Sequence, residues 1–386
     1  MIRQGTMHPI YDGENISTVA NLPNPNMKWE QTAQTNIGWD LGFFDGRLNI
    51  GGDFYYKKTT DLFTNVDVSP INGITSYIMN NGDMLNKGFS ISLNGYPVKT
   101  KNFRWYMSTY YSVNLNKVQT DDARNYNLND YLNGTAVVSG QPISTFYSYK
   151  FLGLNPQNGA PMFDDWEDRW HLLQGKTLDE VVPMILVNSG TRDPKFSGDL
   201  NNTFTYKNWS LSLNFSYSLG SKVRLFEMYG PIINGISAAA NVREEFLDRW
   251  QVPGDEKYTV YPLIISPSSP DYEHYRLHYS APQRAVGPNS GVPAFANNVW
   301  QMYDDSDLRV VSGNYLKLQS LSFSYRLNDR LLRKTPFTQL SISFNTHNCF
   351  TISAKELRGQ DPSQAGFADA GLSIRPSYTI GLNVSF

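Results

Sequence analysis

Alternation between apolar and polar positions is the clearest pattern in this sequence. From Trp209 to Leu219, aromatic or aliphatic residues occupy every second position, and Ser or Asn occupies the positions between them. The last ten residues, 377–386, repeat the pattern. Successive side chains of a β-strand point to opposite faces, so a period of two predicts a strand with one apolar and one polar face.

About eleven segments are predicted to be strands on this basis. Several span ten to fourteen residues, whereas strands of soluble proteins average about 5–6 residues. A tilted strand of about ten residues crosses a bilayer. The sequence therefore predicts an all-β fold, an antiparallel transmembrane β-barrel. The other nine predicted strands are 30–43, 48–57, 89–94, 103–114, 143–152, 181–188 (or 160–163), 196–206, 321–327 and 337–346.

Short and long connections alternate between these predicted strands. The short ones include 44–47 and 207–208, and the long ones are 60–85, 115–141, 220–312 and 347–376. Outer-membrane barrels have this contrast, with short periplasmic turns and long external loops. The alternation requires one more crossing between residues 152 and 196, which is why 181–188 is included. Bacterial barrels have an even number of strands, so eleven indicates a missed strand or part of a barrel.

Composition excludes some other classes. The 386 residues include 33 Lys and Arg against 35 Asp and Glu, which argues against a nucleic-acid binder. The single cysteine, Cys349, cannot form an intramolecular disulfide. Tyr, Trp and Phe gather at predicted strand ends, as expected where a barrel meets the headgroups of a lipid bilayer. A soluble glycan-binding β-protein, which also alternates and is rich in aromatic residues, is the alternative.

An ordered series of motifs runs along most of the chain. The motifs are Asn24-Pro25-Asn26-Met27-Lys28-Trp29-Glu30, Gln34 to Asp40, Tyr55 to Leu62, Gly198 to Lys207, Asp248-Arg249-Trp250, Tyr315 to Leu318 with Ser324-Tyr325, Asn345 to Phe350 and Gly359-Gln360-Asp361-Pro362. This series resembles the SusC/RagA-like family of TonB-linked outer-membrane transporters. It covers essentially residues 20–386, the second half of the family's barrel. Departures are Met27, where Leu is usual, and residues 347–350, where the family more often has Asn-Leu-Phe.

The resemblance implies an outer-membrane importer of oligosaccharides or peptides. Family barrels have about twenty-two strands, so residues 1–386 are expected to form the C-terminal part of one barrel domain, without the plug. TonB would act through an N-terminal segment that is not visible here, and a SusD-like surface lipoprotein would be the partner. Tyr378, Leu382 and the terminal Phe386 are similar to the signal read by the outer-membrane assembly machinery. A receptor for iron chelates or cobalamin is an alternative within the wider group.

Catalytic and metal-binding chemistry is weakly represented. The sequence has no Gly-rich phosphate loop and no nucleophile elbow, so an enzyme is disfavoured. His274 and His278 have a spacing of four but lack the catalytic Glu of a zinc protease. The acidic clusters at 164–168 and 304–307 are interpreted as solvated loop carboxylates. Ca²⁺ bound in an external loop is the alternative.

Aromatic residues of the outer loops are the candidate binding residues. A short helix is predicted within the connection 220–312, at 235–247. Aromatic faces stack on sugars and clamp peptides, so these residues would line a ligand vestibule or contact the lipoprotein partner, and both interpretations stay open. The candidates are Trp166, Trp170, Tyr258, Tyr261, Tyr272, Tyr275 and Trp300.

Overall fold

One curved antiparallel sheet of nine strands dominates the computed structural model, and neighbours in the chain are neighbours in the sheet. The strands are β3 (Gln31–Phe43), β4 (Leu48–Thr60), β7 (Asp83–Lys99), β8 (Phe103–Gln119), β13 (Phe196–Tyr206), β14 (Trp209–Leu219), β17 (Tyr315–Arg326), β18 (Gln339–Ser353) and β19 (Ser377–Ser385). The structure describes residues 2–4, 17–19, 24–67, 71, 76–120, 126–164, 171–173, 176, 178–230, 242–264, 299–333, 335–363 and 375–386.

The register of the sheet converts the alternating sequence into two unlike faces. One row of paired residues on the outer face is entirely apolar, and the next row, on the inner face, is almost entirely polar. The outer row is Ile37, Phe54, Phe89, Val113, Phe196 and Leu219. The inner row is Gly38, Asp53, Ser90, Ser112, Ser197 and Ser218.

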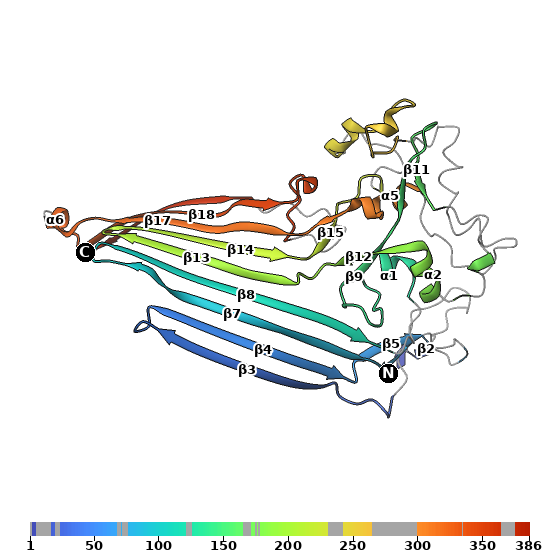
Figure 1. Ribbon diagram of the computed structural model, residues 1–386, viewed down its shortest axis with the longest axis horizontal. Coiled ribbons are helices and arrows are strands. Elements are labelled where there is room, and N and C mark those ends of the chain that lie inside the picture. Colours follow the sequence, from blue (N-terminus) through green and yellow to red (C-terminus); the bar gives the residue numbers. More distant parts are fainter. Residues whose placement is uncertain are drawn as a thin grey trace.

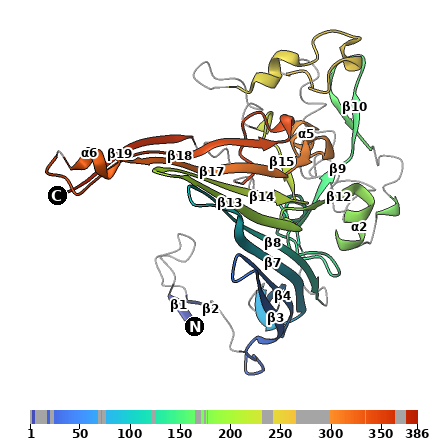
Figure 2. The same cartoon turned by 60° about the vertical axis from the view of Figure 1, so that its left-hand side comes forward.

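The outer face is exposed rather than packed against a second layer. Ile37 is 62% exposed and Phe54 is 48% exposed, and the sheet is a single layer in Figure 2. A soluble protein buries such a face, whereas a membrane protein presents it to lipid. Among the residues described, no helix is long and apolar enough to cross a bilayer.

Short turns and long connections lie at opposite ends of the strands (Figure 1). The short-turn end carries the small helix α6 (Asp329–Leu332). At the other end, the described parts of residues 126–192 and 222–312 fold together into what we call the outer lobe. Its elements are α1 (Leu128–Leu132), β9 (Thr145–Tyr149), β10 (Phe151–Leu154), β11 (Pro161–Phe163), α2 (Leu178–Ile185), β12 (Leu186–Thr191), β15 (Lys222–Arg224), η5 (Glu244–Asp248), η6 (Asp255–Lys257), α5 (Val299–Asp304), η7 (Asp307–Arg309) and β16 (Val310–Ser312).

Two pairs of short strands and one short helix complete the described chain. β5 (Phe63–Asp67) and β6 (Ser76–Asn80) form a hairpin between β4 and β7. β1 (Ile2–Gln4) pairs with β2 (Ser17–Val19). The short helix η8 (Lys355–Leu357) follows β18.

Two of the eleven predicted strands do not join the large sheet. Residues 143–152 contain β9, which pairs with β12 inside the outer lobe, and all five residues of β9 are buried. Most of 181–188 lies in α2, because Val181, Val182 and Ile185 share the helix face that packs on the lobe core. The alternative, 160–163, falls largely in β11, a three-residue strand of the same lobe.

Removing these two predicted strands leaves the alternation of short and long connections unchanged. Removing both crossings makes residues 120–195 one long connection between β8 and β13. Short and long connections then still alternate, with nine strands in place of eleven. Of the helix predicted at 235–247, residues 235–241 lie outside the described chain, and the described end enters the 3₁₀-helix η5.

Candidate functional site

The outer lobe is held by an aromatic core drawn from two connections far apart in the sequence. Tyr303 of α5 is fully buried, and its ring lies 5.6 Å from that of Phe151 and 5.4 Å from that of Tyr229. Tyr229 in turn donates a hydrogen bond to the Pro262 carbonyl at 2.6 Å. Burial raises the pKa of both tyrosines, so their hydroxyls stay protonated. The lobe is therefore a packed unit and not a set of independent loops.

A buried arginine joins the two connections by hydrogen bonds. Arg224 of β15 donates to the backbone carbonyls of Leu132 and Tyr147, at 2.9 and 2.6 Å, and to Ser148 Oγ at 2.9 Å. It also pairs with Asp305 at 2.7 Å. Burial lowers the pKa of Arg224, and the Asp305 carboxylate opposes that shift. Burial likewise raises the pKa of Asp305 to about 6, although Arg224 opposes it.

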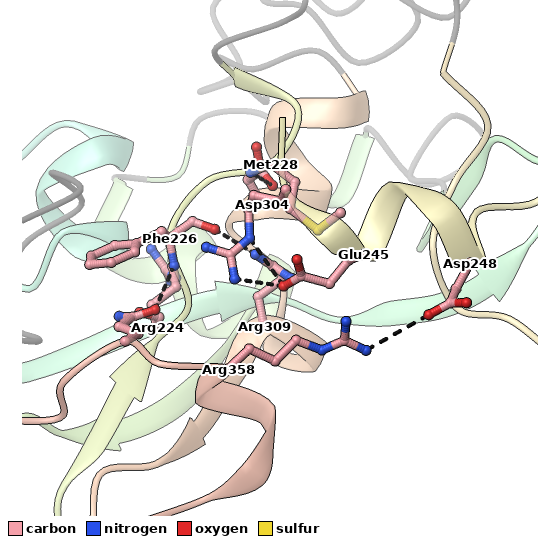
Figure 3. Close-up of polar contacts among 10 residues, drawn as sticks. Arg224, Phe226, Met228, Glu245, Asp248, Asp304, Arg309 and Arg358 are labelled. Atoms are coloured by element: carbon pink, nitrogen blue, oxygen red, sulfur yellow. Dashed lines mark hydrogen bonds and ion pairs between the residues drawn. The ribbon is translucent and has the colours of Figure 1, made fainter. Parts of the chain in front are cut away.

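The neighbouring carboxylate of Asp304 fixes a turn of the outer lobe. It accepts three backbone N–H bonds, from Met228, Tyr229 and Gly230, at 2.8–2.9 Å. Burial raises the pKa of Asp304, while Arg309 and these N–H donors oppose the shift. Arg309, only 2% exposed, donates to the Phe226 carbonyl in the same segment (Figure 3).

The segment after β18 attaches to this network through Gln360 and Asp361. Gln360 accepts from the backbone N–H of Phe226 at 3.1 Å and donates to the Arg224 carbonyl at 3.2 Å. Asp361 pairs at 3.0 Å with Lys317 of β17, and both side chains are buried. These are the residues of the Gly-Gln-Asp-Pro motif, so that motif joins the outer lobe to the sheet.

The Asp-Arg-Trp segment has a similar connecting role. The indole of Trp250 packs directly over Gly159: a Cβ on Gly159 would lie 2.4 Å from the ring. The backbone N–H of Trp250 donates to the Tyr261 carbonyl at 2.9 Å. Asp248 lies 3.8 Å from Arg358, near η8 (Figure 3).

A polar depression of about 230 Å³ lies on the inner face of β3, β4, β7 and β8. Two glycines make room for its carboxylates. A Cβ on Gly38 would lie 2.6 Å from Asp53 Oδ1, and a Cβ on Gly51 would lie 2.6 Å from Asp40 Oδ1. The residues that line it are Gly38, Trp39, Asp40, Gly51, Gly52, Asp53, Ser90, Ser92 and Tyr110.

Sequence reasoning missed this depression, although a signal was present. β3 and β4 each contain Gly-x-Asp, at residues 38–40 and 51–53. The antiparallel register pairs Gly38 with Asp53 and Asp40 with Gly51. Each carboxylate therefore lies over the glycine of the other strand, and paired Gly-x-Asp motifs on adjacent strands predict this arrangement.

The predicted binding residues divide into three groups. Trp166, Trp170, Tyr272 and Tyr275 lie outside the described residues. Tyr258 is 90% exposed on the surface of the outer lobe, and Tyr261 is half-buried against the lobe core. Trp300 is 2% exposed, and its indole N–H donates to the Leu263 carbonyl at 3.2 Å. Trp300 is therefore a core residue, because the apolar face of α5 packs inward, and not a surface contact.

The predicted assembly residues lie in β19 and directly after it. Tyr378 and Leu382 are 65% and 62% exposed on the outer face of this edge strand, and Phe386, which follows the strand, is 83% exposed. The Phe386 ring lies 5.2 Å from Phe337, which precedes β18.

The acidic cluster at 304–307 is already engaged by protein donors. Asp304 and Asp305 bind the groups described above, and Asp307 accepts from the Phe151 N–H at 2.9 Å. Most of the cluster at 164–168 and the pair His274 and His278 lie outside the described residues. Within the described chain, no group of three or more His, Cys, Asp or Glu side chains converges.

Comparisons with known proteins agree with this architecture. Residues 4–243 match the family model "TonB dependent receptor-like, beta-barrel". TonB-dependent receptor P3 of Formosa agariphila is 25% identical over 401 residues, covering 96% of this chain and 36% of the relative. TonB-dependent receptor SusC of Bacteroides thetaiotaomicron is 30% identical over 224 residues, covering 55% of this chain and 21% of SusC.

A solved structure has the same fold along the whole chain. The RagAB peptide transporter superposes with a TM-score of 0.69 at 19% identity, covering 100% of this chain and 38% of that one. The chain thus spans little more than a third of the length of P3 and of that structure. Since the family model matches more than half of it, the chain belongs to the TonB-dependent receptor-like β-barrel family of the outer membrane.

Proposed function

We propose that this chain forms barrel wall and outer loops of a TonB-dependent transporter that imports oligosaccharides or peptides. The observation that carries the proposal is the inner face of the sheet, where Ser, Asn and Tyr side chains form rows broken by few charges. Hydroxyl and amide groups exchange hydrogen bonds with sugar hydroxyls and peptide amides alike. Asp40, Asp53 and Tyr110 line the polar depression on this face.

A SusD-like lipoprotein is the proposed partner, and the exposed surface of the outer lobe supports it. Four apolar side chains project from one short segment: Leu247, Val252, Tyr258 and Val260 are 73%, 58%, 90% and 43% exposed. Apolar and aromatic side chains of this kind are enriched in protein interfaces. The TonB contact and the plug are assigned to parts of the transporter beyond these residues.

Uptake measurements test the transport proposal. In a host lacking the transporter, the full-length gene should restore growth on a glycan or peptide mixture. Replacing both carboxylates of the depression, with Asp40→Asn and Asp53→Asn, should slow labelled-ligand uptake while leaving the barrel heat-modifiable on gels. Rescue of growth by a siderophore or cobalamin, and by neither nutrient mixture, would instead support the alternative receptor class. A product that stays in the aqueous phase without detergent would overturn the membrane proposal itself.

Tyr258→Ala tests the partner surface. Truncating an exposed interface tyrosine should weaken binding of the purified lipoprotein about tenfold or more, measured by surface plasmon resonance. Lys257→Ala is the matched control, since Lys257 is the exposed preceding residue, at the end of η6. Equal affinities of the two variants and the wild type would exclude this surface as the contact.

A further inference from the structure

An apolar groove of about 460 Å³ opens at the short-turn end of the sheet, beside the turn that joins β3 to β4. Leu48, Leu93 and Met107 contribute from the outer face of three adjacent strands, where Gly95 pairs with both Leu48 and Met107. The lining residues are Phe44, Arg47, Leu48, Leu93, Gly95, Tyr96, Pro97 and Met107.

Local backbone features create the groove. Gly95 lets the backbone of the β3–β4 turn approach β7 closely, since a Cβ there would lie 2.3 Å from the Arg47 carbonyl oxygen. Directly after it, the register between β7 and β8 shifts between Gly95 and Val98. This irregularity turns Tyr96 and Pro97 out of the ladder to form one wall. The groove is therefore built by the sequence and is not a general gap between strands.

One cation lies at the groove, and it is part of a basic end of the molecule. Arg47 is exposed, and none of the ion pairs found among the described residues involves it. The short-turn segments 44–47, 99–103, 207–208 and 326–338 together hold eight basic and two acidic residues. By contrast, the connection 220–314, at the other end, holds eight basic and eleven acidic residues.

Aromatic side chains place this end at the membrane interface. On the outer face, Trp105 stacks on Phe204 at 5.7 Å and Trp209 on Phe323 at 5.2 Å. The Lys207 ammonium lies over the ring of Tyr206, 5.3 Å from its centre. The Lys99 ammonium lies 5.2 Å from the centre of the Tyr96 ring in the same way. Such belts of aromatic and basic residues occur at the level of lipid headgroups.

We propose that the groove binds an anionic phospholipid of the periplasmic leaflet. Its acyl chain would lie against Leu48, Leu93 and Met107, and its phosphate would bind the Arg47 guanidinium. Arginine matches phosphate geometry and charge. The surrounding basic residues favour a lipid with net negative charge over a zwitterionic one. This lipid site is separate from the proposed transport path, which runs along the opposite face of the sheet.

Native mass spectrometry of the full transporter tests the site. The protein is delipidated and titrated with phosphatidylglycerol or phosphatidylcholine in mild detergent. We expect one tightly retained phosphatidylglycerol and at least tenfold weaker retention of phosphatidylcholine. Arg47→Gln should reduce phosphatidylglycerol retention about tenfold, and Met107→Trp, which fills the groove, should also displace it. Lys355→Gln, an exposed basic residue near the opposite end, is the matched control and should bind as the wild type does.

Other outcomes would overturn the proposal. Equal retention of phosphatidylglycerol and phosphatidylcholine would show that the groove binds acyl chains without selecting the headgroup, which contradicts the role of Arg47. Undiminished retention in both Arg47→Gln and Met107→Trp would place the lipid elsewhere. Heat-modifiable gel migration of each variant shows that the barrel has folded, so that a loss of lipid is not a loss of structure.

Discussion

At the scale of single residues, Gly159 and Trp250 show how one glycine can hold two loops together. Gly159 has φ +66°, in the left-handed region that residues with a Cβ rarely adopt. The Trp250 ring lies where a Cβ on this residue would project. The Gly159 carbonyl also accepts a hydrogen bond from Leu263 at 3.0 Å. The connection 120–195 therefore meets the connection 220–312 through a contact that needs the absence of a side chain.

Gly159→Ala should loosen the outer lobe. The left-handed backbone and the displaced indole together should cost about 2–5 kcal/mol. Limited proteolysis should then cut the lobe while the strands stay protected. Gly46→Ala is the matched control, because Gly46 has φ +78° but open space around the position of a Cβ. Equal proteolysis of the two variants would mean that the Trp250 contact contributes nothing.

Asp305 predicts a pH dependence of the outer lobe. Its pKa is raised to about 6 by burial, above the value of about 3.9 for an unfolded Asp. Between these values the folded lobe binds more protons than the unfolded one, so its unfolding free energy decreases as pH rises from about 4 to 6. Burial raises the pKa of the adjacent Asp304 in the same direction.

Protease resistance measured from pH 5 to 7 checks this sign. The wild-type lobe should be more resistant at pH 5 than at pH 7, with the cleavage rate at each pH normalised to that of an unfolded reference substrate. Asp305→Asn keeps an oxygen acceptor for Arg224 and should flatten the dependence. The exposed Asp248→Asn is the control. A steeper dependence in Asp305→Asn than in the wild type would contradict the assignment.

At the scale of elements, the strands of the large sheet were readable from sequence and the outer lobe was not. Trp209–Leu219 and the neighbours of β14 alternate because one face meets lipid and the other meets polar groups. β9 is buried on both faces, and α2 is a helix with one buried face, so a period of two carries no information in either segment. The predictions at 143–152 and 181–188 were therefore wrong. Trp300 was misplaced for the same reason: an aromatic residue in a loop gives no sign of whether it faces a core or a ligand.

The Lys317–Asp361 ion pair is expected to stabilise the attachment of the segment after β18 to β17. Burial opposes ionisation of Asp361, yet hydrogen bonds from Ser363 and Lys317 leave the pKa of its carboxyl lowered. Asp361→Ala leaves Lys317 buried and unpaired, which should cost about 3–5 kcal/mol. Ser363→Ala removes one hydrogen-bonding hydroxyl and should cost about 1 kcal/mol. Hydrogen exchange of residues 354–363 measures both, and similar exchange in the two variants would refute the role of the pair.

At the scale of the whole molecule, tryptophans divide between lipid and protein surroundings. Trp209 is 43% exposed on the apolar outer face, whereas Trp300 is 2% exposed within the outer lobe. Trp209 begins β14 at the short-turn end of the sheet, whereas Trp300 lies in α5 of the outer lobe, at the other end of the strands (Figure 1).

Brominated lipids should distinguish these tryptophans. In vesicles with brominated acyl chains, Trp209→Phe should reduce the quenched part of the fluorescence, because its ring contacts lipid. Trp300→Phe should reduce only the unquenched part, because the lobe shields it. If Trp300→Phe removed quenched emission instead, the outer lobe would be in contact with lipid, which would contradict its place beyond the strand ends.

The two edges of the sheet have a consequence for biogenesis. β3 and β19 each offer one side of their backbone without a strand partner in the described chain, and all thirteen residues of β3 are exposed. In the hydrocarbon core of a bilayer, each of these N–H and C=O groups would lack a hydrogen-bond partner, which costs roughly several kcal/mol per group. The sheet can therefore enter lipid only with both edges capped by further strands. Until that closure, each edge is an open template that can capture a strand from another copy, so yield should fall as expression rises.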